Sequence, residues 1–201
     1  MPPHPITVDD LHGVFAVPPL PRRPGPRRAI DFDAAEHLAA HVEAGLDAVG
    51  RLVDDGVARA IKYAVVRDNP GEDDYLEGLL RRVRHDRVLS GIGERPAIAH
   101  FQTFGLRSMT TGSGCIAPHT YAAFFSACEA GDWRLAAALR ERFMPLEDLR
   151  DAWGPARVLH HAAELCGIAA TGPIPPFVSP WGAAQIAQVA PVATALLGRG
   201  A

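Results

Sequence analysis

Residues 57–68 read VARAIKYAVVRD, and Lys62 lies inside the apolar run of this stretch. Lys62 is the only lysine among 201 residues, because the other 19 of the 20 lysine and arginine side chains are arginines. A coding preference for arginine would also have replaced a lysine that carried only positive charge. Arginine stays protonated, whereas a desolvated lysine loses its proton and attacks carbonyl groups. Two interpretations follow: a Schiff-base lysine, or a strand-end lysine whose ammonium reaches solvent.

The composition limits the class of protein. A chain of 201 residues is long enough for one or two compact domains with a substantial core. A net charge of −3 gives no electrostatic reason to expect a nucleic acid or an acidic membrane as partner. The cysteines at 115, 128 and 166 lack metal-ligand spacing and suit free thiols in a reducing cytosol. Without a signal region or a membrane-length apolar run, we expect a cytoplasmic protein.

Strands and helices alternate in the middle of the chain. The pattern predicts strands at about 58–66, 88–91 and 107–110, and helices at about 72–83 and 95–104. Such alternation is typical of parallel βα units, in which chemistry collects at the carboxyl ends of the strands. The loops GIGERP (91–96) and TTGSGCIAP (110–118) therefore belong to the same edge as the end of the Lys62 strand.

Both ends of the chain have their own patterns. A short strand is predicted at 13–19, a loop at 19–28 and a helix from Asp31 to Val42. Helical periodicity resumes at Leu46 without an intervening strand or loop, and Gly56 is expected to end that helix. After Pro118 the chain is almost wholly helical, with an extended stretch at 171–182. The first predicted helix ends at Gly131, and the second runs from the Asp132 cap to a break at Pro145. Further helices are predicted at 146–153, 155–166 and 183–198.

Short motifs exclude several kinds of site. TTGSG lacks the spacing of a phosphate loop, although a tight turn whose amides bind a carboxylate is compatible with it. Glu94 and Arg95 fall at the predicted functional edge, where a helix start and a surface salt bridge explain them nearly as well. The histidines have no metal-ligand spacing, and Ser113 lacks the nucleophile-elbow pattern of a hydrolase.

Several segments, in chain order, resemble the dihydrodipicolinate synthase / N-acetylneuraminate lyase family. GVFAVPP and IDFDAAEHLAAHVEAG resemble its first strand and helix, and AIKYA resembles its sixth strand, which carries the Schiff-base lysine. LSGIGE resembles the seventh strand and its loop. SMTTGSGCIAPHTYAAFFSACEAGDWRLAAAL resembles the eighth strand and following helices, and PLEDLR through GPARVLHHAAELCGI resembles the C-terminal helical region. The resemblance carries the Schiff-base role over to Lys62.

The resemblance implies an α/β fold derived from the (β/α)₈ TIM barrel. We expect a partial barrel of about four parallel strands over residues 1–118, then the last barrel helix and a C-terminal helical region over 119–201. The implied activity is that of a class I aldolase-type lyase, similar to 4-hydroxy-tetrahydrodipicolinate synthase. Lys62 would attack pyruvate or a related 2-keto acid for C–C bond formation or cleavage, without metal or organic cofactor. The residues implied to line the substrate site are Gly91, Thr110, Thr111 and Gly112.

The family's second to fifth strands have no counterpart, and the join lies at Gly45-Leu46. The glycine-threonine-glutamate motif that binds the keto-acid carboxylate and the tyrosine that relays protons are absent with them. Tyr63 does not replace that tyrosine, because neighbouring strand residues point to opposite faces. The retained strands form either a half-barrel sheet or a sheet with the first strand beside the sixth. Unpaired edges favour a homo-oligomer, and the alternative function is a catalytically inactive remnant with an oligomerising or structural role.

Overall fold

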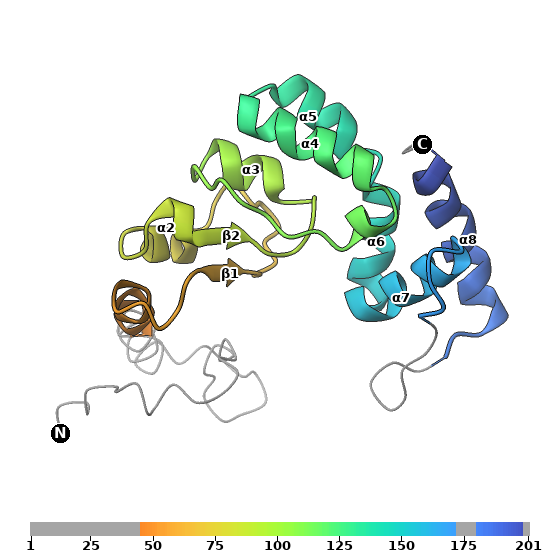
Figure 1. The fold of residues 1–201 in the computed structure, drawn as a ribbon, viewed down its shortest axis with the longest axis horizontal. Coiled ribbons are helices and arrows are strands. Elements are labelled where there is room, and N and C mark those ends of the chain that lie inside the picture. Colours follow the sequence, from red (N-terminus) through yellow and green to blue (C-terminus); the bar gives the residue numbers. More distant parts are fainter. Residues whose placement is uncertain (1–44, 172–179, 199–201) are drawn as a thin grey trace, which may run out of the picture. The chain divides into compact units, whose positions relative to one another are not determined.

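The computed structural model describes residues 45–171 and 180–198 (Figure 1). The predicted strand at 13–19, the loop at 19–28 and the helix from Asp31 to Val42 lie outside the described residues, as does most of the stretch at 171–182. The chain divides into two compact units, and the predicted domain boundary at residue 118 stays a prediction. The described part of the first unit comprises 45–61 and 74–87, and the second comprises 62–73 and the residues from 88 onward.

In the first unit, a helix at 45–54 packs against α2 (Asp74–Leu80). A β-carbon built on Gly78 would lie 3.0 Å from Cδ1 of Leu46, so the glycine allows the two helices to approach closely. Leu46 is 1% exposed and Leu76 is completely buried at this contact. The first helix ends where the sequence predicts, because Gly56 adopts a φ of +74° that other residues rarely adopt.

The sheet consists of short parallel strands. β1 (Ile61–Tyr63) pairs with β2 (Val88–Ser90) (Figure 1), and a parallel bridge joins Ser90 to Met109. The Thr110 N–H donates to the Ser90 carbonyl at 2.8 Å. The predicted strand at 107–110 is thus reduced to one bridge, and no closed barrel is formed by the residues that the structure describes. β1 is much shorter than the predicted strand at about 58–66, whereas β2 lies within the predicted strand and is followed by a turn in which Gly93 has a φ of +89°.

The two faces of this sheet differ in burial. Tyr63 and Ser90 are buried on one face, where His100 of α3 (Ala97–Gln102) packs on both. The rings of His100 and Tyr63 are 5.8 Å apart, and Nδ1 of His100 is 2.8 Å from the Ser90 hydroxyl. Lys62 points to the other face and is exposed. The alternation that the sequence predicts for Lys62 and Tyr63 is confirmed.

The rest of the second unit is helical, as predicted. Helix α4 packs against α5, and α7 packs against α6 and α8 (Figure 1). Gly131 has a φ of +71° after α4, and the Asp132 side chain accepts from the Leu135 N–H at 3.0 Å to cap α5. Pro145 does not break a helix but lies in the first turn of α6. N–H groups in a first turn make no hydrogen bond within the helix, so a proline is tolerated there. The five helices are α4 (Pro118–Ala130), α5 (Trp133–Arg140), α6 (Met144–Trp153), α7 (Pro155–Leu165) and α8 (Ala183–Gly198).

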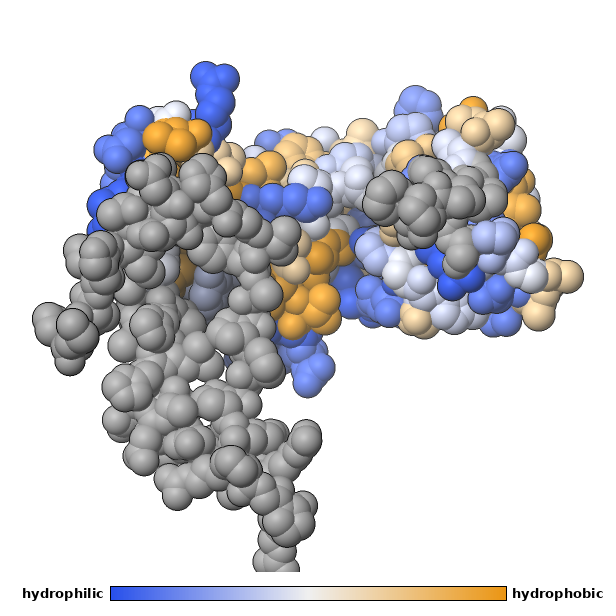
Figure 2. All heavy atoms as spheres, turned by 90° about the horizontal axis from the view of Figure 1, so that it is seen from below, coloured by the Kyte–Doolittle hydropathy of each residue, from blue (hydrophilic) through white to orange (hydrophobic). Residues whose placement is uncertain are grey.

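Apolar and charged side chains alternate over the surface that Figure 2 shows. Within the described ranges, Val66 and Val57 are the most exposed large apolar residues, at 71% and 67%. Exposed apolar side chains are ordinary on protein surfaces. Among the described residues, none of the helices combines the length and the hydropathy that a membrane span requires.

Candidate active site

Lys62 lies in the middle of β1 and packs against Gly91, the residue that follows β2. A β-carbon on Gly91 would lie 2.8 Å from Cγ of Lys62 and would overlap the carbonyl oxygen of Tyr63. Only glycine therefore permits this close approach of β1. Within residues 45–171 and 180–198, the Lys62 ammonium makes no ion pair or hydrogen bond with another side chain.

Thr110 lies on the same face as Lys62 and Gly91. Ser90 and Met109 pair across the parallel bridge, and both are buried. Because successive strand residues point to opposite faces, the residues that follow them, Gly91 and Thr110, share the face that carries Lys62. The structure therefore brings three of the five predicted site residues together at the carboxyl edge of the sheet.

Thr111 and Gly112 shape the loop that follows. The Thr111 hydroxyl donates to Oε1 of Glu94 and accepts from the Gly114 N–H at 2.7 Å. Its single proton is thus engaged within the protein. A β-carbon on Gly112 would overlap Cδ1 of Leu159, so the glycine lets the loop lie against α7. Both residues hold the loop in place beside Thr110.

Tyr63 takes part in a separate buried group on the other face of the sheet. Its hydroxyl donates to Oδ2 of Asp73, and Arg67 donates to both oxygens of that carboxylate at 2.9 and 3.0 Å. Burial, followed by the hydrogen bond to Asp73, raises the pKa of the Tyr63 phenol above its usual value. Tyr63 is therefore a structural anchor of β1, and its proton is not available to the Lys62 face.

The sequence interpretation missed a buried pair of carboxyl groups, Glu94 and Glu147, which are 0% and 1% exposed. Oε1 of Glu147 accepts from Ser113 at 2.7 Å and from Arg150, one turn further along α6. Burial, and then the negative charge of Glu147, raises the pKa of Glu94 to about 8. The spacing of Glu147 and Arg150 was a usable signal for an ion pair on one helix face. Nothing in the sequence indicates that Glu94 joins them.

The neighbour of Glu94 behaves as the sequence suggests. Arg95 pairs with Asp148 and Asp151 of α6, with 2.9 Å between Nε and the Asp151 oxygen. The surface salt bridge is confirmed for Arg95, whereas Glu94 points into the protein. The Ser90–His100 pair is buried, with Ser90 0% and His100 1% exposed. Among the described residues, no three His, Cys, Asp or Glu side chains are arranged to hold a metal ion.

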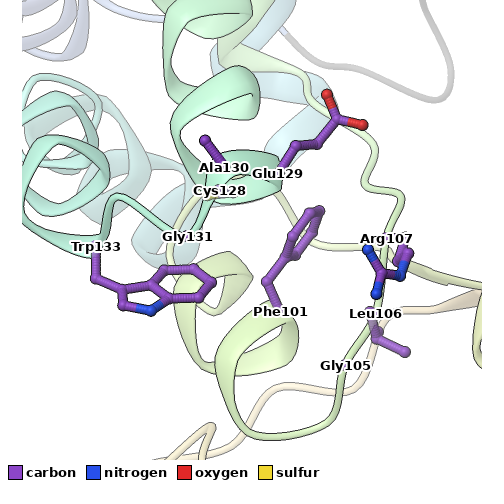
Figure 3. Close-up of a pocket in the computed structure, with 9 residues that line it drawn as sticks. All are labelled: Phe101, Gly105, Leu106, Arg107, Cys128, Glu129, Ala130, Gly131 and Trp133. Carbon is purple, nitrogen blue, oxygen red and sulfur yellow. The ribbon is translucent and has the colours of Figure 1, made fainter.

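A hollow of about 260 Å³ lies elsewhere in the second unit. Figure 3 shows the rings of Phe101 and Trp133 at this hollow, with Arg107 on the side of Phe101 away from Trp133. Arg107 precedes the bridge at Met109, so the hollow adjoins the amino-terminal end of that segment. None of the predicted site residues lines it. In parallel α/β proteins, ligands bind at the opposite, carboxyl edge.

The described fold is thus α/β, mostly helical, with a short parallel sheet whose carboxyl edge carries Lys62, Gly91 and Thr110. The likeness to the aldolase family rests on the sequence segments quoted above. No family model matches this chain, and no curated protein or solved structure does either.

Proposed function

We propose that this protein is a lyase of the class I aldolase type, in which Lys62 forms a Schiff base with pyruvate or a related 2-keto acid. The observation that carries the proposal is the placement of the only lysine. Lys62 extends over Gly91 on the face that α3 does not cover, and Thr110 lies on the same face in the segment that pairs with the other side of β2. The alternative of a strand-end lysine whose ammonium only reaches solvent is distinguished from this proposal by the trapping experiment below.

The chemistry follows from the amine. The neutral Lys62 amine adds to the keto carbon and gives a carbinolamine, which takes up a proton and loses water to leave a protonated imine. The imine nitrogen then accepts the electron pair of the C3–H bond, whose proton passes to solvent water, or of a C–C bond at C3, whose other fragment leaves as an aldehyde, and in both cases an enamine forms. Reaction of the enamine with an aldehyde makes the new C–C bond, and hydrolysis of the imine releases the product and the free lysine.

Gly91 and Thr110 would contribute space and polar groups to the substrate. The absent side chain of Gly91 leaves room beside the Lys62 stem, and the Thr110 hydroxyl lies on the same face. Thr111 and Gly112 would act by holding the loop rather than through the Thr111 proton, which Glu94 already accepts. The predicted substrate-binding set is therefore divided into two roles in this proposal.

A catalytically inactive remnant is the second candidate, and one observation favours it. Among the described residues, the tyrosine next to Lys62 points away from it and is bound to Asp73. Without a proton relay at the amine, general acid–base catalysis would be lost, which costs about 10²–10⁴-fold in rate. In this case the chain would serve as an oligomerising or structural protein.

The test is reductive trapping. The purified protein is incubated with pyruvate, reduced with borohydride, and analysed by intact mass and by peptide mapping. One adduct of reduced pyruvate on the peptide that contains Lys62 is expected, with a yield that saturates as the pyruvate concentration rises. The only other primary amine is the chain terminus, so the two positions are easily distinguished.

Two controls make the result decisive. Lys62→Arg keeps the positive charge but forms no imine, so its adduct on this peptide should vanish. The same protein unfolded in urea measures the reactivity of a lysine without a site. Labelling of Lys62 in the folded protein at or below the level in urea would exclude the lyase and leave the inactive remnant.

A further inference from the structure

Two carboxyl groups and one cation are enclosed together in the second unit. Glu94 is fully buried, Glu147 is 1% exposed, and the Arg150 side chain is 8% exposed. Gly93 lies directly against this group, since a β-carbon there would be 2.6 Å from Oε2 of Glu147. Two ionised carboxylates beside a single guanidinium would leave one uncompensated negative charge in the interior. Buried charges without compensation are strongly unfavourable.

The hydrogen-bond donors around the pair do not remove this deficit. Ser113 and Arg150 donate to Oε1 of Glu147, and Thr111 donates to Oε1 of Glu94. Oε2 of Glu94 is buried and has no donor among the described residues, while the side chains of Glu94 and Glu147 are within hydrogen-bond reach of one another. Two carboxylate oxygens that face each other are both acceptors. A proton on one of them turns the contact into a hydrogen bond.

We infer that Glu94 and Glu147 share one proton, and that this proton latches the loops at 91–96 and 110–114 onto α6. Glu94 belongs to the first loop, Thr111 and Ser113 belong to the second, and Glu147 belongs to α6. The first loop also contacts α6 on the surface through Arg95, which pairs with Asp148 and Asp151. The inference does not rest on the proposed lyase activity.

The latch makes the position of both loops depend on pH. In the closed form, the two loops lie against α6 and the carboxyl pair retains its proton. In an opened form the glutamates are exposed and release that proton at a lower pH. Between these two pH values, the closed form therefore binds one proton more than the opened form. Opening therefore becomes about tenfold easier for each pH unit between about pH 5 and about pH 8. The two loops carry Gly91 and Thr110, so the same proton controls the edge of the sheet where Lys62 lies.

Other titratable groups near the pair do not supply the same effect. The Cys115 thiol and the Tyr121 phenol both interact with the charge of Glu94, and their pKa values are raised, mainly by burial. A rise in these pKa values moves their ionisation away from neutral pH. Between pH 5 and pH 8, the exchange of a proton in this group is thus assigned to Glu94, whose pKa is raised to about 8.

The decisive variant is Glu94→Gln, because an amide reproduces the protonated carboxyl. It accepts from Thr111 with its oxygen and donates to Glu147 with its nitrogen, without a proton to release. Urea unfolding of both proteins is followed from about pH 5 to about pH 8. For each rise of one pH unit, the ratio of the unfolding constant of the natural protein to that of Glu94→Gln should increase about tenfold. Amide hydrogen exchange at Gly114, whose N–H donates to Thr111, should show the same difference.

Two further variants complete the experiment. Glu129→Gln neutralises an exposed glutamate and should keep the slope of the natural protein. Glu94→Ala removes both hydrogen bonds and should be less stable than Glu94→Gln at every pH. Equal slopes for the natural protein and Glu94→Gln would overturn the inference. A Glu94→Gln protein that is unfolded at pH 5 would overturn it as well, because the isostere of the protonated state would then fail to replace it.

Discussion

Cγ of Lys62 lies 2.8 Å from the position that a β-carbon on Gly91 would occupy. The stem of the lysine therefore occupies the space that a side chain at position 91 would need. The carbonyl oxygen of Tyr63 overlaps the same position, so the backbone of β1 is equally close. Substitution at Gly91 tests this contact directly.

Gly91→Ala should destabilise the protein by about 1–3 kcal/mol, because the added methyl group must displace β1 or the lysine stem. Urea unfolding measures this loss. Gly45→Ala is the matched control, since a β-carbon there has nothing within 4 Å. Helical alanine is favoured over glycine, so this control should be neutral or stabilised by about 0.5–1 kcal/mol. Equal effects of the two substitutions would contradict the close contact.

Lys62→Met should leave the stability of the protein within about 0.5 kcal/mol of its natural value. Lys62 is exposed, and its ammonium makes no side-chain hydrogen bond or ion pair within the described ranges. Thermal unfolding monitored by circular dichroism provides the measurement. A large loss would assign Lys62 a structural role and would weaken the argument for a Schiff-base lysine.

Asp73→Ala should cost about 2–4 kcal/mol, because it removes the buried acceptor that Tyr63 and Arg67 share. Asp73→Asn keeps one acceptor oxygen and should lose less. Asp68→Ala, which removes an exposed carboxylate, serves as the control and should change stability by no more than about 0.5 kcal/mol. Denaturant titration of the four proteins ranks them, and an Asp73→Ala protein as stable as Asp68→Ala would refute the anchor.

Acid should destabilise the protein through His100. Burial lowers the pKa of this histidine to about 4, while the charge of Asp73 opposes the shift. The unfolded chain therefore binds more protons than the folded protein below the usual pKa of histidine, and stability is lost as the pH falls. The unfolding constant should rise about tenfold for each unit by which the pH falls from about 6 to about 4. His100→Gln should flatten this slope, and an unchanged slope would exclude His100 as its source.

Asp132→Ala should destabilise the protein by about 1 kcal/mol, because the first turn of α5 loses the acceptor of the Leu135 N–H. Asp132→Ser offers another acceptor at the same position and should recover most of the loss. The comparison is made by thermal unfolding of the three proteins. Equal stability of the alanine and serine variants would show that the side-chain cap contributes nothing.

Local features of the chain could be predicted because they depend on neighbouring residues. The turns at Gly56 and Gly131 and the cap at Asp132 depend on backbone conformation and on an amide three residues away. The helix predicted at about 183–198 is confirmed as α8. Pro145 shows the limit of such local rules, because the same residue ends one helix or begins the next.

The polar interior could not be predicted in the same way. Glu94 and Arg95 are adjacent in the sequence, yet one is buried beside Glu147 and the other pairs with acidic residues on the surface of α6. Which of them turns inward depends on the position of α6, far along the chain. The same holds for the contact of Lys62 with Gly91, since strand pairing joins segments that α2 separates.

The sequence by itself determined the α/β class of the fold, the helix ends at Gly56 and Gly131 and the identity of the single lysine, because composition, periodicity and caps are local properties. Only the tertiary structure decided which face of the sheet carries Lys62 uncovered, which glycines are required by close contacts, and that two glutamates lie together. The reason is physical: burial and the pKa of a carboxyl depend on every neighbour in space, and most of those neighbours are distant in sequence.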